Sequence, residues 1–208
     1  MTRRLLAALL LFMAVFLVAD HWLARPSMTR FDPDAMGRTE AAMWRDYYDG
    51  HWLSLGVHTA GLVRRQYGFS WWDSARASFH AARAALHFRQ RTDDPRCLPA
   101  LVSYYDILAP AMPAGFSSTE AANLELRWWT ERRRDVSEDE YARTIAALAG
   151  MCHGITAAAA EPASRLRAEM MAYRDARRDG RMTENDWEHV AARLREAWGA
   201  LRTAVDAR

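Results

Sequence analysis

The chain contains no lysine, so all 28 of its cationic side chains are arginine. The 26 Asp and Glu residues are interspersed with them, and the formal net charge is only +2. Such a balance gives no large field of one sign. It argues against nucleic acid as a partner, because binding to a phosphate backbone depends on an excess of cations.

Cysteine is almost absent as well, with only Cys97 and Cys152, which are far apart in the sequence. Neither belongs to a Cys-x-x-Cys pair, so zinc and dithiol redox chemistry have no signature here. Two alternatives stay open for the pair. They form one disulfide if the body of the chain lies outside the cytoplasm, or they are two separate buried thiols.

Motifs that carry catalysis are also lacking. The sequence has no Gly-x-Ser-x-Gly, no phosphate-binding glycine loop and no His-Glu-x-x-His. Repeated Glu-x-x-His, the signature of a ferritin-like di-metal site, is missing too. No enzymatic activity is therefore expected from the sequence, and no cofactor is predicted.

One long apolar run is present near the N-terminus, from Leu5 to Ala19. Its 15 residues fit the core of a signal peptide or a membrane anchor. We favour an anchor, because no good cleavage site follows and because Trp22 and Arg25 stand where interfacial residues belong. Residues 1–24 are thus predicted to be a single-pass anchor, with membrane contact through residues 5–24.

Charges flanking the apolar run do not decide its orientation, because arginines precede and follow it. The very short N-terminal tail favours a body outside the cytoplasm. A cytoplasmic body remains the alternative.

After this segment, residues 25–38 read as a linker, and residues 39–208 as one α-helical domain. Serine or threonine followed three residues later by an acid recurs at Ser70, Ser117, Ser137 and Thr183, as in a capping box. No stretch shows sustained strand alternation. The pattern predicts an all-α helical bundle of about seven helices, or an irregular α-solenoid. The predicted helices are 39–67, 70–91, 95–108, 118–135, 138–153, 162–178 and 183–205.

Apolar residues at helical spacing indicate which faces turn inward. In the first long helix the stripe contains Trp44, Tyr48, His51, Leu55, His58 and Leu62. In the next helix the corresponding seam contains Trp72, Ala75, Phe79, Ala82 and Leu86. Because only two or three residues separate the two helices, we expect them to form an antiparallel hairpin.

Histidines provide the candidate ligand site. His51 and His58 share the apolar stripe of the first helix with Trp44 and Tyr48, so the four residues are predicted to line a pocket. Facing histidines in a bundle can hold a divalent metal or a haem iron. The competing interpretation makes both of them hydrogen-bonded core residues.

A second group of histidines and arginines lies on the other face of the next helix. Arg76, His80, Arg83 and His87 follow one another at helical spacing. We expect this strip to bind anions if it binds anything.

Tryptophan beside arginine is typical of binding hot spots, and it occurs in one run. The run consists of Trp128, Trp129, Arg132, Arg133 and Arg134. Core packing of the two rings is the interpretation that we favour, and a partner surface formed by these five residues is the alternative.

The segment from Asp175 to Asp186 has the spacing of a degraded calcium loop. Arg177 occupies a position where an oxygen ligand belongs and would repel the ion. A turn between two helices explains the same residues.

The function that these features favour is that of a non-catalytic, membrane-anchored helical protein that binds another protein, as an assembly or accessory factor. The alternative is a ligand-, metal- or haem-binding helical bundle that uses His51 and His58.

Overall fold

The computed structural model describes residues 3–134, 136–177 and 182–208. Within these ranges the chain is helical and holds no strand, which confirms the all-α prediction. Nine α-helices and one short 3₁₀ helix are found there. They are α1 (Arg3–Leu23), α2 (Pro33–Asp49), α3 (Trp52–Tyr67), α4 (Trp71–Gln90), α5 (Cys97–Leu108), η1 (Ala109–Ala111), α6 (Ser118–Arg133), α7 (Glu138–His153), α8 (Ala157–Asp175) and α9 (Glu184–Asp206).

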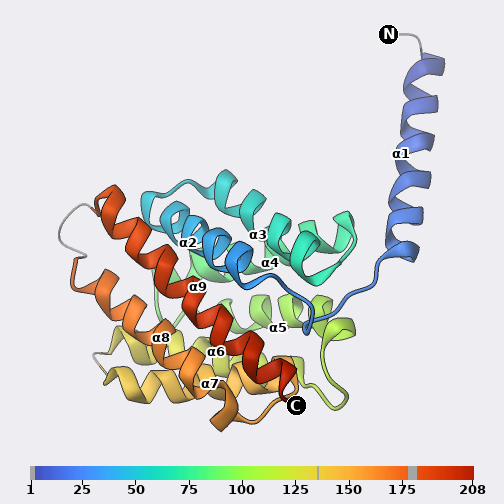
Figure 1. Ribbon diagram of the computed structural model, residues 1–208. Helices are drawn as coiled ribbons and strands as arrows, with labels where there is room; N and C mark the ends of the chain where they lie inside the picture. The colour runs from blue at the N-terminus through green and yellow to red at the C-terminus, as the bar shows by residue number, and fades with distance from the viewer. Residues whose placement is uncertain (1–2, 135, 178–181) are drawn as a thin grey trace.

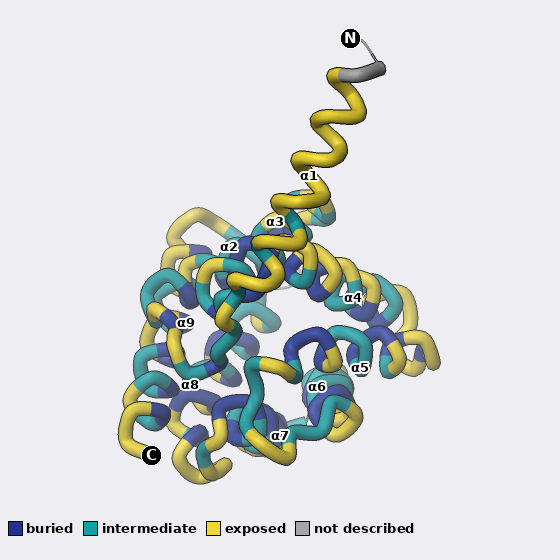
Figure 2. Tube along the Cα trace, turned by 90° about the vertical axis from the view of Figure 1, so that its right-hand side faces the viewer, coloured by how far each residue is buried: buried dark blue, intermediate teal, exposed yellow. Residues whose placement is uncertain are grey.

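Helix α1 stands apart from the others. It projects away from the rest of the molecule on the side of α3 and α4, opposite α7 (Figures 1 and 2). Leu5–Leu23 is the one stretch of the described chain that is long and apolar enough to cross a membrane. Nearly all of its side chains are exposed, so α1 has no protein surroundings that would explain its composition.

Helices α2 to α9 form a closed ring. Each packs on the next one along the chain, and α9 packs extensively on α2 (Figure 2). Because short turns join consecutive helices, neighbours run in opposite directions around the ring. The C-terminal ends of α2, α4, α6 and α8 therefore gather at one end of it.

Helix starts in the ring follow the signals in the sequence. Ser70, Ser117 and Thr183 each accept a hydrogen bond from the backbone N–H three residues on. Thr183 completes a capping box with Asp186, whereas Ser137 begins α7 without a side-chain bond. These residues satisfy N–H groups that the first turn of a helix leaves free.

The predicted first helix, residues 39–67, is wrong. It is divided into α2 and α3 at Gly50, whose φ of 77° places it in the left-handed region that ends a helix. The break also divides the predicted stripe from Trp44 to Leu62 between two helices. In addition, α2 begins at Pro33, and Met28 and Phe31 are buried, so much of the predicted linker belongs to the folded body.

Two further predictions need correction. Helix α8 begins at Ala157 rather than at Pro162, because Thr156 caps it by accepting from the N–H of Ala159. The predicted inward seam of α4 is largely reversed, since Trp72 and Phe79 are exposed. The buried residues of α4 are mostly small instead, namely Ser74, Ala77, Ser78 and Ala84, together with Phe88.

Closure of the ring depends on Gly37 of α2. A Cβ at this position would lie 2.5 Å from the backbone N of Arg195 and 2.7 Å from its Cα, both in α9. Only glycine lets the two backbones approach so closely.

We predict that Gly37→Ala lowers the free energy of unfolding by about 1–3 kcal/mol, because the added methyl forces α2 and α9 apart. Gly199→Ala is the matched control. It lies in α9 with nothing near its Cβ, and it should stabilise the chain by up to about 1 kcal/mol through helix propensity alone. Urea unfolding followed by tryptophan fluorescence measures both. An equal effect of the two substitutions would contradict the role given to Gly37.

Candidate functional site

The centre of the ring holds a cavity of about 310 Å³. Every helix from α2 to α9 contributes to its wall. The volume lies at the lower end of the roughly 300–1,000 Å³ of small-molecule sites. Most of the wall is aromatic or aliphatic, so the cavity suits a ligand with an apolar body.

Glu40 of α2 is a buried carboxylate on this wall. It accepts a hydrogen bond from Trp198 Nε1 at 2.7 Å and another from Trp44 Nε1 at 3.2 Å. The guanidinium of Arg167 forms an ion pair with it. A buried charge requires such partners, so the Glu40–Arg167 pair is neutralised within the protein.

Glu125 of α6 is the second carboxylate of the wall. Tyr105 donates its hydroxyl to it at 3.0 Å, and Trp129 donates Nε1 at 2.8 Å. Burial raises the pKa of Glu125, because the charged form is desolvated, while these donors act in the opposite direction. Unlike Glu40, it has no arginine in an ion pair with it among the described residues.

Tyrosine hydroxyls also belong to the polar part of the wall, and that of Tyr47 hydrogen-bonds to no described residue. Tyr67 of α3 is only 5% exposed, and neither its hydroxyl nor that of Tyr104 hydrogen-bonds to a described residue. Burial raises the pKa of both groups, so they stay protonated and can donate. Both residues line the cavity, so their hydroxyls are available to a bound molecule.

Arginines gather where the C-termini of the even-numbered helices meet. Arg132 binds Asp175 of α8 through two bonds of 2.7 Å and donates to the hydroxyl of Tyr48 at 2.6 Å. Arg133 is the exposed member of the described lining, and its guanidinium lies 5.7 Å from the ring centre of Phe88. We take this exposed part of the lining, beside Arg133, as the mouth of the cavity.

Arg89 and Arg174 add positive charge at the same end. Arg89 lies 5.0 Å from the ring centre of Trp52, and Arg174 lies 3.3 Å from that of Tyr48. Asp175 is shared by Arg132 and Arg174, so the four arginines Arg89, Arg132, Arg133 and Arg174 have one carboxylate among the described ion pairs. A negatively charged group would be attracted there.

The four residues of the predicted ligand pocket are separated by the structure. Trp44 and Tyr48 line the cavity. His51 and His58 instead face Asp46, with His58 Nδ1 at 2.6 Å and His51 Nδ1 at 3.8 Å from its carboxylate. No group of three or more His, Cys, Asp or Glu that could hold a metal is found in the described ranges. The two histidines therefore brace the turn between α2 and α3.

The predicted anion strip stays on one face of α4. Arg76 contacts Asp73 at 3.4 Å, and His87 lies 3.6 Å from Asp94. Burial and the neighbouring cations of Arg83 and Arg76 lower the pKa of His80. The strip lies outside the cavity, beside the exposed face of α4.

The structure separates the tryptophans of the predicted partner surface from its arginines. Trp128 is buried, and Trp129 lines the cavity against Phe88. Arg132 and Arg133 belong to the cavity mouth, while Arg134 is exposed as the C-cap of α6. This placement removes the two indole rings from the surface on which a partner was expected.

Cys97 and Cys152 are both buried and free. Burial raises the pKa of Cys97 to about 11 and also raises that of Cys152. In the structure the cysteines are thus separate thiols, which was one of the two alternatives.

Part of the calcium-like segment, Asp179 and Gly180, lies outside the described residues. The carboxylate of Asp186 is bound by Thr183, Tyr173 and Arg177. These contacts occupy it as a helix cap.

Sequence reasoning missed Glu40, Glu125, Arg167 and the unpaired tyrosines. A signal was present in α6, where Glu125 lies one turn from Ala121 and Ala122 and one turn from Trp128, on the face that becomes buried. An acid on an apolar helix face is an indication of a buried polar site.

His153, at the end of α7, also lines the cavity and gives the site a dependence on pH. Its Nδ1 donates to the carbonyl of Met28 at 2.8 Å, and its ring packs against Phe31. Burial lowers the pKa of His153 from 6.5 to about 4. The folded state thus binds a proton less readily than the unfolded state.

The stability that neutral His153 provides should be complete above pH 6.5 and should fall as the pH drops toward 4. The loss is on the order of 3 kcal/mol, and urea unfolding at several pH values measures it. His153→Gln keeps a donor for Met28 but cannot titrate, so it should flatten this dependence. His189→Gln, at an exposed site, should leave it unchanged. If the free energy of unfolding of His153→Gln fell with pH as steeply as that of the wild-type chain, His153 would not be the group responsible.

Resemblance to other proteins does not help to interpret this site. Comparisons of the chain with protein-family models, with curated proteins and with solved structures find no match. The function has to be inferred from the chemistry of the cavity itself.

Proposed function

We propose that this protein is a membrane-anchored binding protein that holds an amphipathic anion inside its helical ring. The observation that carries the proposal is the central cavity, to which α2 through α9 all contribute. Side chains normally fill the interior of a protein to close packing, so a space that they leave open at the centre of the ring is available to a ligand.

The apolar part of the ligand would lie among the aromatic and methionine side chains. Met36, Met43 and Leu148 belong to this part of the wall, together with Trp128 and Trp198. Methionine adapts to irregular shapes, which suits a flexible chain or a fused-ring skeleton. The free hydroxyls of Tyr67 and Tyr104 would bind a polar substituent within the body of the ligand.

The charged head of the ligand would lie at the mouth. Arg133 lines the cavity and makes no ion pair with a described residue, and Arg132 is positioned by Asp175. Arg89 lies behind them, where it donates to the carbonyl of Tyr47 at 3.0 Å. Guanidinium groups bind carboxylate and phosphate through paired hydrogen bonds. A carboxylate head group and a phosphate head group would therefore both be bound in this way.

Helix α1 would hold the ring at a membrane. Its length and composition support a single span. With a body outside the cytoplasm, the ring would collect its ligand at the outer surface of the membrane. Protease protection in intact and permeabilised cells tests this orientation.

Binding of another protein, as an assembly or accessory factor, stays a prediction. It is based on the anchor, the Trp- and Arg-rich helical body and the absence of catalytic motifs, and of the candidate surface residues Trp128 is buried and Trp129 lines the cavity. The cavity supports a ligand-binding function more directly.

A bromine-bearing fatty acid tests the cavity, because bromine quenches indole fluorescence on contact and Trp44, Trp128, Trp129 and Trp198 lie on the wall. In the full chain held in phosphatidylcholine nanodiscs, 11-bromoundecanoate should quench part of the emission saturably. Ala149→Phe fills the cavity and should abolish that part, whereas Ala147→Phe, on the same helix but outside the lining, should retain it. Quenching of Trp22 through the lipid should be non-saturable and equal in all variants. Absence of a saturable part, or its persistence in Ala149→Phe, would contradict the proposal.

The charge of the head group is tested separately at the mouth. Arg133→Gln should weaken binding of 11-bromoundecanoate about threefold to fivefold, as expected for an exposed ion pair. It should not affect the neutral 11-bromo-1-undecanol. Arg134→Gln removes the next arginine, which is exposed but does not line the cavity, and is the matched control. Equal binding of acid and alcohol would rule out an anionic head.

A further inference from the structure

The outer surface of the α3–α4 hairpin is apolar. Leu53 is 85% exposed and Val57 63% in α3, while Phe79 is 62% and Trp72 57% exposed in α4. Ser78 donates to the carbonyl of Gly56 at 2.7 Å, so Val57 and Phe79, the next residues along the chain, lie at the same level of the hairpin. Together with Trp71 these four residues form what we call the outer face.

This outer face is confined to one side of the ring. Apart from those of α1, all large apolar side chains that are exposed in the described chain belong to α3 or α4. Single exposed apolar residues are normal, but a group of them on two neighbouring helices marks a contact surface. The opposite side of the ring, formed by α7 and α8, carries none.

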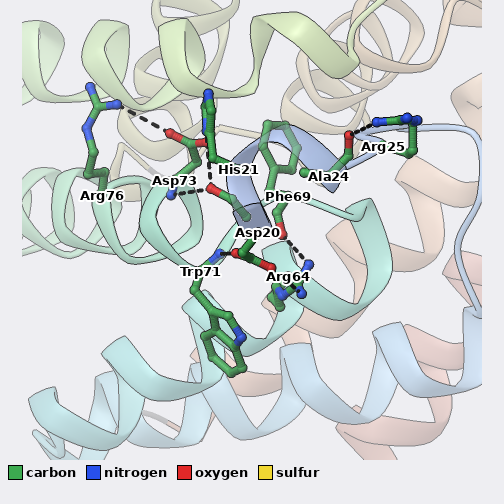
Figure 3. A network of polar contacts seen from close by, with 10 residues as sticks. Asp20, His21, Ala24, Arg25, Arg64, Phe69, Trp71, Asp73 and Arg76 are labelled. Atoms are coloured by element: carbon green, nitrogen blue, oxygen red, sulfur yellow. Dashed lines mark hydrogen bonds and ion pairs between the residues drawn. The ribbon is translucent and has the colours of Figure 1, made fainter. Parts of the chain in front are cut away.

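Helix α1 leaves the ring on the same side as the outer face (Figures 1 and 2). A network of polar contacts fixes its last turn to the hairpin (Figure 3). Asp20 accepts from the N–H of Trp71 at 2.7 Å and from Arg64 at 2.8 Å. His21 Nδ1 lies 3.0 Å from the carboxylate of Asp73. The direction of α1 is therefore coupled to the orientation of the outer face.

Tryptophan and arginine surround the junction. Trp22 at the end of α1 is exposed, and so are Trp71 and Trp72 at the start of α4. Tryptophan is enriched at the level of lipid headgroups. Arg76 and Arg83, from the predicted anion strip, are exposed beside the outer face on the same helix and could bind anionic headgroups.

We propose that the outer face lies on the membrane surface, with Leu53, Val57, Trp72 and Phe79 inserted among the lipid headgroups. The α3–α4 hairpin would thus act as an interfacial element beside the single span. This inference rests on the membrane anchoring proposed above and is independent of ligand binding in the cavity. The occupant is the bilayer rather than a second protein, because the outer face continues directly from the helix that would cross it.

Fluorescent labels placed on the full chain test this contact. The native thiols are buried, so an environment-sensitive probe such as an NBD iodoacetamide can be attached at Val57→Cys or Phe79→Cys. Ala158→Cys, exposed on α8 across the ring, is the matched control, and the wild-type chain measures background labelling. The labelled chains are reconstituted in vesicles of phosphatidylcholine and phosphatidylglycerol, with and without lipids that carry a nitroxide near the headgroup.

Labels at positions 57 and 79 should be quenched by the nitroxide lipid at least about threefold more than the label at position 158, because an interfacial helix lies within the headgroup region. Iodide in the buffer quenches labels that are exposed to water, so it should quench the label at position 158 more than the labels at positions 57 and 79. Equal quenching at all three positions would overturn the inference. Extraction with alkaline carbonate shows whether a negative result means that the chain is not anchored or only that its outer face does not lie on the membrane. A chain that is released was never anchored, whereas a retained chain with equal quenching is anchored but does not rest on its outer face.

Discussion

The close approach of α2 and α9 at Gly37 is the contact on which the remaining structure depends. Seven of the eight packed helix pairs in the described ring join neighbours in sequence, and such pairs would form in an open array as well. Only the α2–α9 pair joins the two ends. Without it the aromatic wall of the cavity would lie open to water, and the buried carboxylates would be solvated.

Ring closure also explains why the interior contains charges. Helices arranged in a circle leave a central space, which here is lined by many large side chains, among them Trp44, Trp128, Trp129 and Trp198. Indole and phenol groups carry polar atoms that need partners when buried. Glu40 and Glu125 accept from three tryptophans and one tyrosine, so the carboxylates satisfy donors that an aliphatic core would not contain. The hydroxyls of Tyr47, Tyr67 and Tyr104, which hydrogen-bond to no described residue, remain for a ligand.

The helices could be predicted from the sequence because their signals are local. Ser70, Ser117 and Thr183 mark starts through bonds that span three residues. The break at Gly50 could not, because a glycine in a helical pattern is compatible with continuation until the following helix finds a neighbour. The cavity was beyond prediction for a similar reason. Trp44 and Trp129 come from helices that are distant in sequence, and nothing local places them on one wall.

The reversed face of α4 shows a different limit. A stripe of large apolar residues predicts an inward face only if water is the alternative environment. In α4 the large residues Trp72 and Phe79 face outward, while Ser74 and Ala77 are buried and let the neighbouring helices approach closely. Such an inversion is unfavourable in water, since exposed aromatic surface costs about 25 cal/mol per Å². It becomes favourable when a second apolar medium lies outside, and the helix fixed to α4 by Asp20 is the one whose composition suits that medium.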